Sequence, residues 1–450
     1  MPAASWTVRV RGFQGMSFTG RAAGVWPAGA VHASGRKGGL QIMAEPAREH
    51  VPVGAQAAIY GAGLFSFSQV MISGVVVALF VVELQVSAFT IGIVLGARHF
   101  LTLILSIHGG VMMDRLGTRR VMIACAVAST LTPLLFPFAQ WVAVLVALQM
   151  MAGLADAMVW MGAQALSGSV MKGNPTYVGR MTFACRIGSF VGPMAAGAAW
   201  DLAGLWGAFG FMAAWSALGL VSVLRIAADE SEAGARPRAP VRLADLVPRF
   251  GDYVSAFSLA AIPAVALVLY VTMIRVGGTG IQNSFYVVYL DQIGISGSAI
   301  GLLLGVSGAC ASVGSLAVGR LARMIHSHWL IVFVVILSVV TIGITPWLFG
   351  LYFLLMFVIG LRGLCLGISQ PLEISVLGRA IGADSQGKGV GLRTTANRVT
   401  GTLVPVVMGG VAELVGIENS FLVMGAVMMA LMMAIALFVH RQPNLGRDLS

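Results

Sequence analysis

The sequence predicts an all-α integral membrane protein of twelve transmembrane helices, arranged as two related bundles of six. Of the 450 residues, 58% are hydrophobic and only 10% are charged, whereas about a quarter of the residues in a soluble domain are charged. Apolar segments of about 20 residues, the length that spans the hydrocarbon core of a bilayer, recur from Ile59 to Val439. A long hydrophilic stretch divides these segments into two sets, and motifs of the first set recur in the second.

The expected spans lie on either side of that hydrophilic stretch, six before it and six after it. The first six cover 57–82, 89–112, 120–138, 141–166, 180–200 and 205–226, and the second six cover 264–290, 298–321, 329–349, 350–376, 391–413 and 419–440. We therefore expect a first bundle at 56–227, a cytoplasmic linker at 228–255, a second bundle at 256–440 and a tail at 441–450.

Residues 1–55 differ in composition from the rest of the chain. They contain many small residues, several Arg and Lys, and no acidic residue before Glu45. This composition fits a targeting segment, a disordered arm, or sequence upstream of a start at Met43. We expect a disordered basic arm.

Basic residues are distributed unevenly between the loops. Loops after the even-numbered spans carry Lys or Arg, whereas the opposite loops carry acids or no charge. By the positive-inside rule both termini are cytoplasmic. The formal net charge of +11 then lies beside lipid headgroups, so we expect the lipid bilayer as a partner and no nucleic acid. We expect a plasma membrane, which in a bacterium is the inner membrane, and a monomer.

Motifs for soluble cofactors are missing from the sequence. It contains no Gly-x-x-x-x-Gly-Lys-Ser/Thr loop for ATP and no His-Glu-x-x-His or Cys-x-x-Cys pair for a metal. The four cysteines lie in or beside apolar spans without metal-ligand spacing. We expect no enzymatic activity, no metal and no cofactor, and a proton gradient as the energy source.

The loop between the second and third spans is the most specific motif. Its residues are Gly110, Asp114, Arg115, Gly117, Arg119 and Arg120. The loop resembles the G-x-L-x-D-R-x-G-R-R/K signature of the major facilitator superfamily, with Thr118 as a departure. The resemblance implies a gating role, and Gly110 would allow close helix packing. A loop that only fixes topology is the alternative. In the second half, Arg323 replaces the acid.

The fifth span carries a second motif. Gly188, Gly192, Pro193 and Gly197 resemble the G-x-x-x-G-P-x-x-G-G motif of superfamily exporters that exchange substrate for protons. Pro405 and Gly409 repeat part of the motif in the eleventh span. Small residues at this spacing also permit close helix packing, so packing alone is the alternative explanation.

Charged residues inside the expected spans are few, and such residues are usually functional. Asp156 in span 4 and Arg362 in span 10 occupy equivalent positions of the two halves. The resemblance places spans 1, 4, 7 and 10 around a central cavity, so we expect these two residues to form a substrate-orienting or gating pair. Two charges with separate buried partners are the alternative. Gln149 occupies the position where the superfamily often has an arginine in span 4.

Polar side chains in spans 7 and 10 form a further candidate site. Arg275, Gln282 and Asn283 follow one another beside several glycines in span 7, as expected where a helix deforms around a ligand. Ordinary helix–helix hydrogen bonds are the alternative. Gln370 in span 10 joins this set, whereas Glu373 is expected near the cytoplasmic end in contact with water. Weaker candidates are Arg98, His99, Arg186 and Arg398.

These features together predict a secondary transporter of a small organic compound that works by alternating access. The expected task is proton-coupled export, with Asp156 as the protonatable group. Import or facilitated diffusion of a polar or anionic metabolite is the alternative, with Arg275 and Arg362 as anion holders. A membrane sensor that retains the fold without transport is a further alternative.

Overall fold

A computed structural model describes residues 51–171, 175–227, 258–348, 350–381 and 386–441, together with two short strands. The chain forms two compact units, Met1–Pro52 and Val53–Ser450. In the first unit, β1 (Ser5–Arg9) pairs antiparallel with β2 (Ser17–Arg21). The last residues of the predicted arm, 51–55, are described and run into the first long helix. The rest of the arm, the linker at 228–255 and most of the tail lie outside the described residues.

The first bundle consists of long helices joined by short turns. They are α1 (Val53–Glu83), α2 (Ala88–Leu116), α3 (Thr118–Leu135), the 3-10 turn η1 (Phe136–Phe138), α4 (Val142–Ser169) and α5 (Pro175–Leu224). Helix α5 contains a break at Ala203 and at Gly204, whose φ is +57°. Glycine adopts this left-handed conformation without steric cost, so α5 comprises two arms that correspond to predicted spans 5 and 6.

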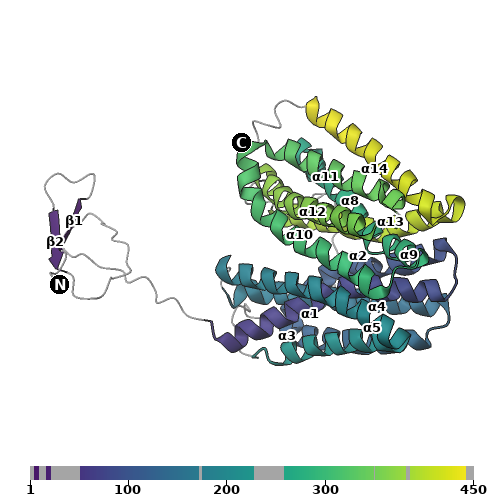
Figure 1. Ribbon diagram of the computed structural model, residues 1–450. Helices are drawn as coiled ribbons and strands as arrows, with labels where there is room; N and C mark the ends of the chain where they lie inside the picture. The colour runs from purple at the N-terminus through teal and green to yellow at the C-terminus, as the bar shows by residue number, and fades with distance from the viewer. Residues whose placement is uncertain are drawn as a thin grey trace. The chain divides into compact units, whose positions relative to one another are not determined.

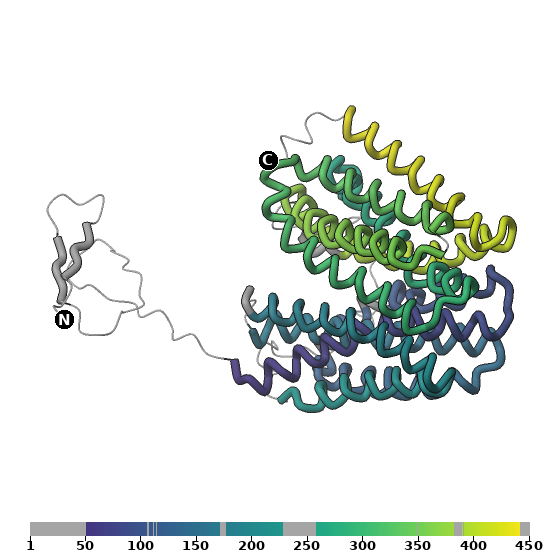
Figure 2. Tube along the Cα trace, viewed as in Figure 1, coloured from purple at the N-terminus to yellow at the C-terminus, as the bar shows by residue number. Residues whose placement is uncertain are grey.

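The second bundle has the same succession of helices. Its elements are η3 (Ser258–Ala261), α8 (Pro263–Gln282), α9 (Phe285–Gln292), α10 (Gly297–Met324), α11 (Ser327–Gly343), η4 (Thr345–Leu348), α12 (Tyr352–Ile381), α13 (Gln386–Val415) and α14 (Ile417–His440). Figure 1 shows the two bundles as two layers, one purple to teal and the other green to yellow. The tube in Figure 2 traces the same two layers.

Hydropathy supports a membrane-spanning fold. Within the described residues, 10 helices are long and apolar enough to cross a bilayer. This set counts both arms of α5 as one span and leaves out the shorter α11 of 17 residues. All twelve predicted ranges fall on helices, and the count of twelve requires the second arm of α5 and α11 as additional spans.

The bundles meet closely where α2 packs along α13 and α5 packs along α10. Glycines make this approach possible: Gly92 lies against the Pro405 carbonyl, Gly301 against the Pro193 carbonyl and Gly197 against the Gly297 carbonyl. These contacts gather at the end of the molecule where α1 ends and α2 begins. We refer to it as the closed end.

The span-5 motif therefore has a packing role. Gly188 and Gly192 lie against α1, whereas Gly197 lies against α10, so one helix joins its own bundle and the opposite bundle. The expectation for Gly110 is wrong: a Cβ atom there would meet no described atom within 4 Å. Its neighbour Gly109 is the residue that packs closely, against Met158 on α4.

Two carboxylates bridge the bundles at the closed end. Asp201 on α5 accepts hydrogen bonds of 2.8 Å from the backbone amides of Gly297 and Ser298, at the start of α10. Glu413 on α13 accepts a hydrogen bond of 3.2 Å from the backbone amide of Phe89, at the start of α2. A carboxylate at a helix N-terminus satisfies a free amide and interacts favourably with the helix dipole.

We predict that Asp201→Ala combined with Glu413→Ala loosens the closed end. Each lost cap removes about 1 kcal/mol, so the equilibrium should shift by roughly fivefold per cap toward separation at this end. Spin labels at the exposed residues Leu202 and Gln292, in a cysteine-free background, report this separation. Glu418→Ala changes an exposed acid at the same end and should leave the distance unchanged. An identical distance distribution in the double variant contradicts the prediction.

Candidate functional site

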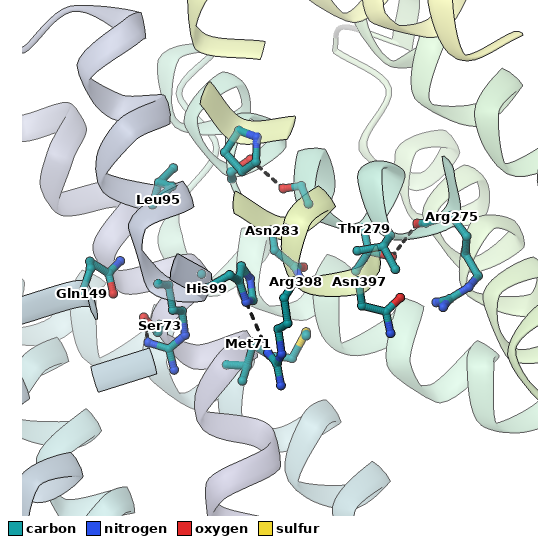
Figure 3. Close-up of a pocket in the computed structure, with 18 of the residues that line it drawn as sticks. Met71, Ser73, Leu95, His99, Gln149, Arg275, Thr279, Asn283, Asn397 and Arg398 are labelled. Atoms are coloured by element: carbon teal, nitrogen blue, oxygen red, sulfur yellow. Dashed lines mark hydrogen bonds between the residues drawn. The ribbon is translucent and has the colours of Figure 1, made fainter. Parts of the chain in front are cut away.

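A cavity of about 330 Å³ lies between the two bundles. Helices α1, α2 and α4 line it from the first bundle, and α8, α12 and α13 line it from the second. Its polar lining is Ser73, Arg98, His99, Gln149, Arg275, Thr279, Asn283, Ser284, Gln370, Thr394, Asn397 and Arg398. Figure 3 shows Gln149, His99 and Ser73 approaching from one bundle and Arg398, Asn397 and Arg275 from the other.

Helical geometry breaks beside this cavity, as the polar run in span 7 predicts. Helix α8 ends at Gln282 and α9 begins at Phe285, so Asn283 and Ser284 lie between two helices. Both residues line the cavity, and the backbone of Asn283 passes close to Gly74 on α1. Gln282 is buried outside the cavity lining, with its Oε1 atom lacking a partner among the described residues.

Asp156 has a different partner from the one predicted. Its carboxylate pairs with Arg98 on α2 and accepts a hydrogen bond from Ser129 on α3, within the first bundle. Arg98 also donates a hydrogen bond of 2.9 Å to Ser73 on α1. The pairing of Asp156 with Arg362 is therefore wrong, because duplication placed each residue inside its own bundle rather than opposite the other.

Arg362 is buried in the second bundle, away from the cavity lining. Its guanidinium lies 5.3 Å from the centre of the Tyr286 ring, a distance typical of a cation–π contact. Its Nε and Nη2 atoms have no hydrogen-bond partner in the described part of the chain. Arg362 is thus not placed to hold an anion in the central cavity.

Arg275 lies in the cavity wall but already has a buried acidic partner. Its Nε atom is 2.8 Å from Glu373 Oε1, and Thr272 donates a hydrogen bond of 2.9 Å to the other carboxylate oxygen. Glu373 is fully buried, so the expected contact with water is wrong. Gln370 lines the cavity as an exposed residue one turn away.

Arg398 is the cavity arginine without an acidic partner in the described residues. Its Nη1 atom lies 3.5 Å from Nδ1 of His99, which comes from the opposite bundle. Asn397 beside it also lines the cavity and was not among the predicted residues. The polar run Thr394–Arg398 in an otherwise apolar span is the sequence signal that identifies both residues. Gln149 on α4 lines the same central cavity, as Figure 3 shows.

The loop motif is described only in part, because the side chain of Asp114 lies outside the described residues. Arg119 donates hydrogen bonds of 2.6 Å to the Ile226 carbonyl and 3.1 Å to the Leu224 carbonyl. These carbonyls end the second arm of α5, so Arg119 caps a helix C-terminus. Gly117 has a φ of +96° between α2 and α3, whereas Arg115 is half-buried and Arg120 is exposed.

Comparison with protein families decides the identity of the chain. The Major Facilitator Superfamily profile matches residues 59–276 and 268–449. The chain belongs to the major facilitator superfamily. Its paired bundles and central cavity are thus those of a superfamily transporter.

Solved structures support the superfamily fold. A structure named nucleoside transporter NupG superposes with a TM-score of 0.65 at 15% identity, covering 85% of this chain and 99% of that one. A structure of peptide transporter POT in complex with sulfate superposes with a TM-score of 0.67 at 16% identity, covering 88% and 96%. A comparison with curated protein sequences found no significant match.

We predict that Glu373→Gln destabilises this superfamily member strongly. The substitution leaves Arg275 buried without a counter-charge, which costs about 3–5 kcal/mol. Thermal unfolding of the purified protein should show a large decrease in melting temperature. The double variant Arg275→Met/Glu373→Gln removes both charges and should recover much of the loss. Equal stability of Glu373→Gln and the parent contradicts the prediction.

Proposed function

We propose that this protein is a secondary transporter of a small polar organic compound that carries an anionic group. The observation that carries the proposal is Arg398, a cation in the central cavity without an acidic partner in the described residues. A charge inside a membrane protein is costly unless it is paired. The anionic group of a bound substrate would provide that pairing.

The charge balance of the cavity supports an anionic substrate. Arg98 and Arg275 are each paired with a buried carboxylate, Asp156 and Glu373. Arg398 therefore remains as an excess positive charge. Amide side chains on both bundles, Gln149 and Asn397 among them, can position the polar part of a substrate. The names of two similar structures, a nucleoside transporter and a peptide transporter, fit a small polar cargo on this fold.

The packing of the two bundles at the closed end supports transport by alternating access. The loops at that end hold acids such as Asp201 and Glu413, whereas the loops at the other end hold most of the basic residues. The positive-inside rule assigns the closed end to the external side. The cavity then faces the cytoplasm, toward which the exposed Gln370 lies. Opening the external side requires the α2–α13 and α5–α10 contacts to separate.

Asp156 connects proton binding with substrate binding in this proposal. Arg98 contacts Asp156 and also lines the cavity. A proton on Asp156 weakens its attraction for Arg98, which then becomes available to a substrate anion. Proton and anion would bind together, which favours cotransport in one direction. Export in exchange for protons has support only from the span-5 motif, whose described contacts are packing contacts.

Proteoliposome transport tests the function and its direction. Purified protein is reconstituted, and accumulation of labelled organic anions is measured with the external pH below, equal to and above the internal pH. Cotransport predicts accumulation when the outside is acidic, and proton exchange predicts accumulation when the inside is acidic. Failure of every organic anion to bind or move contradicts the proposal.

We predict that Arg398→Gln weakens binding of the transported anion by about tenfold to a hundredfold. A hydrogen bond to a charged group contributes about 1.5–3 kcal/mol. Arg320→Gln, at an exposed position of α10, is the matched control and should bind normally. Calorimetric titration of both variants measures the difference. Unchanged affinity in Arg398→Gln contradicts a role for this arginine in anion binding.

We predict that Asp156→Asn abolishes accumulation driven by a pH gradient and retains exchange of substrate across the membrane. The amide cannot take up the coupling proton, and it leaves Arg98 without a counter-charge, as a protonated Asp156 would, so that Arg98 stays available to the substrate anion. Counterflow of labelled substrate measures exchange independently of the gradient. Full proton-driven accumulation by Asp156→Asn removes this residue from the coupling mechanism.

A further inference from the structure

A side pocket of about 150 Å³ opens from the central cavity into the first bundle. The two spaces share Phe67, Val70, Arg98, His99 and Arg398. Arg398, the arginine to which we assign the substrate anion, therefore lies at the junction between the two spaces. A ligand whose anionic group contacts Arg398 can extend from the junction into the side pocket.

The wall of the side pocket is aromatic on one side. Phe67 on α1 and Trp160 on α4 have ring centres 4.9 Å apart and an interplanar angle of 48°. Both rings line the pocket and are only half-buried. Aromatic pairs gain free energy at centroid separations of about 4.5–7 Å, so a third ring in the pocket would extend an existing aromatic cluster.

Small residues on α4 form another part of the pocket wall. Gly153 and Ala157 line the pocket, and their spacing places them on the same helix face as Trp160. The backbone of Arg98 occupies the place that a Cβ atom of Gly153 would take, so this glycine lets α2 and α4 approach closely beside the pocket. The polar part of the lining is Ser66, Arg98, His99, Asp156 and Arg398. A cavity on the order of 150 Å³ holds benzene in another protein, so the volume of the pocket matches a single ring.

We propose that the substrate is an organic anion that contains a planar aromatic ring. Its anionic group binds Arg398 at the junction, and its ring lies in the side pocket against Phe67 and Trp160. This inference rests on the proposed function, because it uses the anion site to place the ring. It adds a class of substrate, aromatic carboxylates and related aryl anions, that the charge of the cavity alone does not specify.

Binding of three small probes to the purified full chain tests the inference. Benzoate supplies ring and charge, cyclohexanecarboxylate supplies the same charge on a non-planar ring, and benzyl alcohol supplies the ring without charge. We expect benzoate to bind about threefold to tenfold more tightly than cyclohexanecarboxylate, in line with the strength of an aromatic pair. Benzyl alcohol should bind at least tenfold more weakly than benzoate, because it cannot pair with Arg398.

Variants separate the ring site from the anion site. In Trp160→Leu the affinities for benzoate and cyclohexanecarboxylate should become about equal. Trp160→Phe should retain most of the preference for benzoate. Trp141→Leu changes an exposed tryptophan at the start of α4, 75% exposed, and should have no effect. Size-exclusion profiles establish that each variant is folded. If Trp160→Leu does not fold, Phe67→Leu, which removes the other ring of the pair, is measured in its place with the same expected loss of preference.

The possible negative outcomes overturn different statements. Equal affinity for benzoate and cyclohexanecarboxylate in the parent protein, or no binding of either, overturns the aromatic substrate class and leaves the anion site standing. A preference for benzoate that persists in Trp160→Leu also overturns it. Benzoate binding that is unaffected by Arg398→Gln contradicts the proposed function instead.

Discussion

The close approach of two helix pairs at one end is the constraint on which the rest of the structure depends. Gly92 and Gly301 bring the backbones of α2 and α5 against those of α13 and α10. The bundles join there without large side chains in between, and farther along α2 and α13 larger residues such as Arg98 and Arg398 line the cavity. Carboxylate caps from Asp201 and Glu413 add polar contacts across the same end. In the proposed transport cycle, this end of the molecule must open and close again.

Buried charge is the second organising principle. Arg98 and Arg275 lie in the cavity wall, and each is held by a carboxylate from its own bundle, Asp156 or Glu373. Such pairs are costly to separate because the low dielectric strengthens the attraction and penalises the isolated ions. Arg398 lacks such a partner in the described part of the chain and contacts only His99 of the opposite bundle. This contrast between paired and unpaired arginines is the basis of the proposed anion site.

The two bundles have diverged while keeping one architecture. Asp156 and Arg362 occupy equivalent positions, yet the acid pairs with Arg98 whereas the base lies on the Tyr286 ring. The first bundle thus offers a removable charge pair next to the cavity and a side pocket beside it. The second bundle supplies the unpaired Arg398. In our proposal the coupling group therefore belongs to the first bundle, whereas residues of both bundles contact the substrate.

The sequence alone determined the membrane class, the positions of the spans, the division into two bundles and the superfamily. Length and hydropathy suffice for these features, because a bilayer requires long apolar helices with satisfied backbones. It also identified Arg275, Asn283, Gln370 and Gln149 as residues near a site. Only the tertiary structure decided which charges pair with each other. It also decided that Glu373 is buried and that Arg398 has no acidic partner among the described residues. Pairing depends on which helix faces meet, and periodicity in one helix carries no information about the rotation of its neighbour.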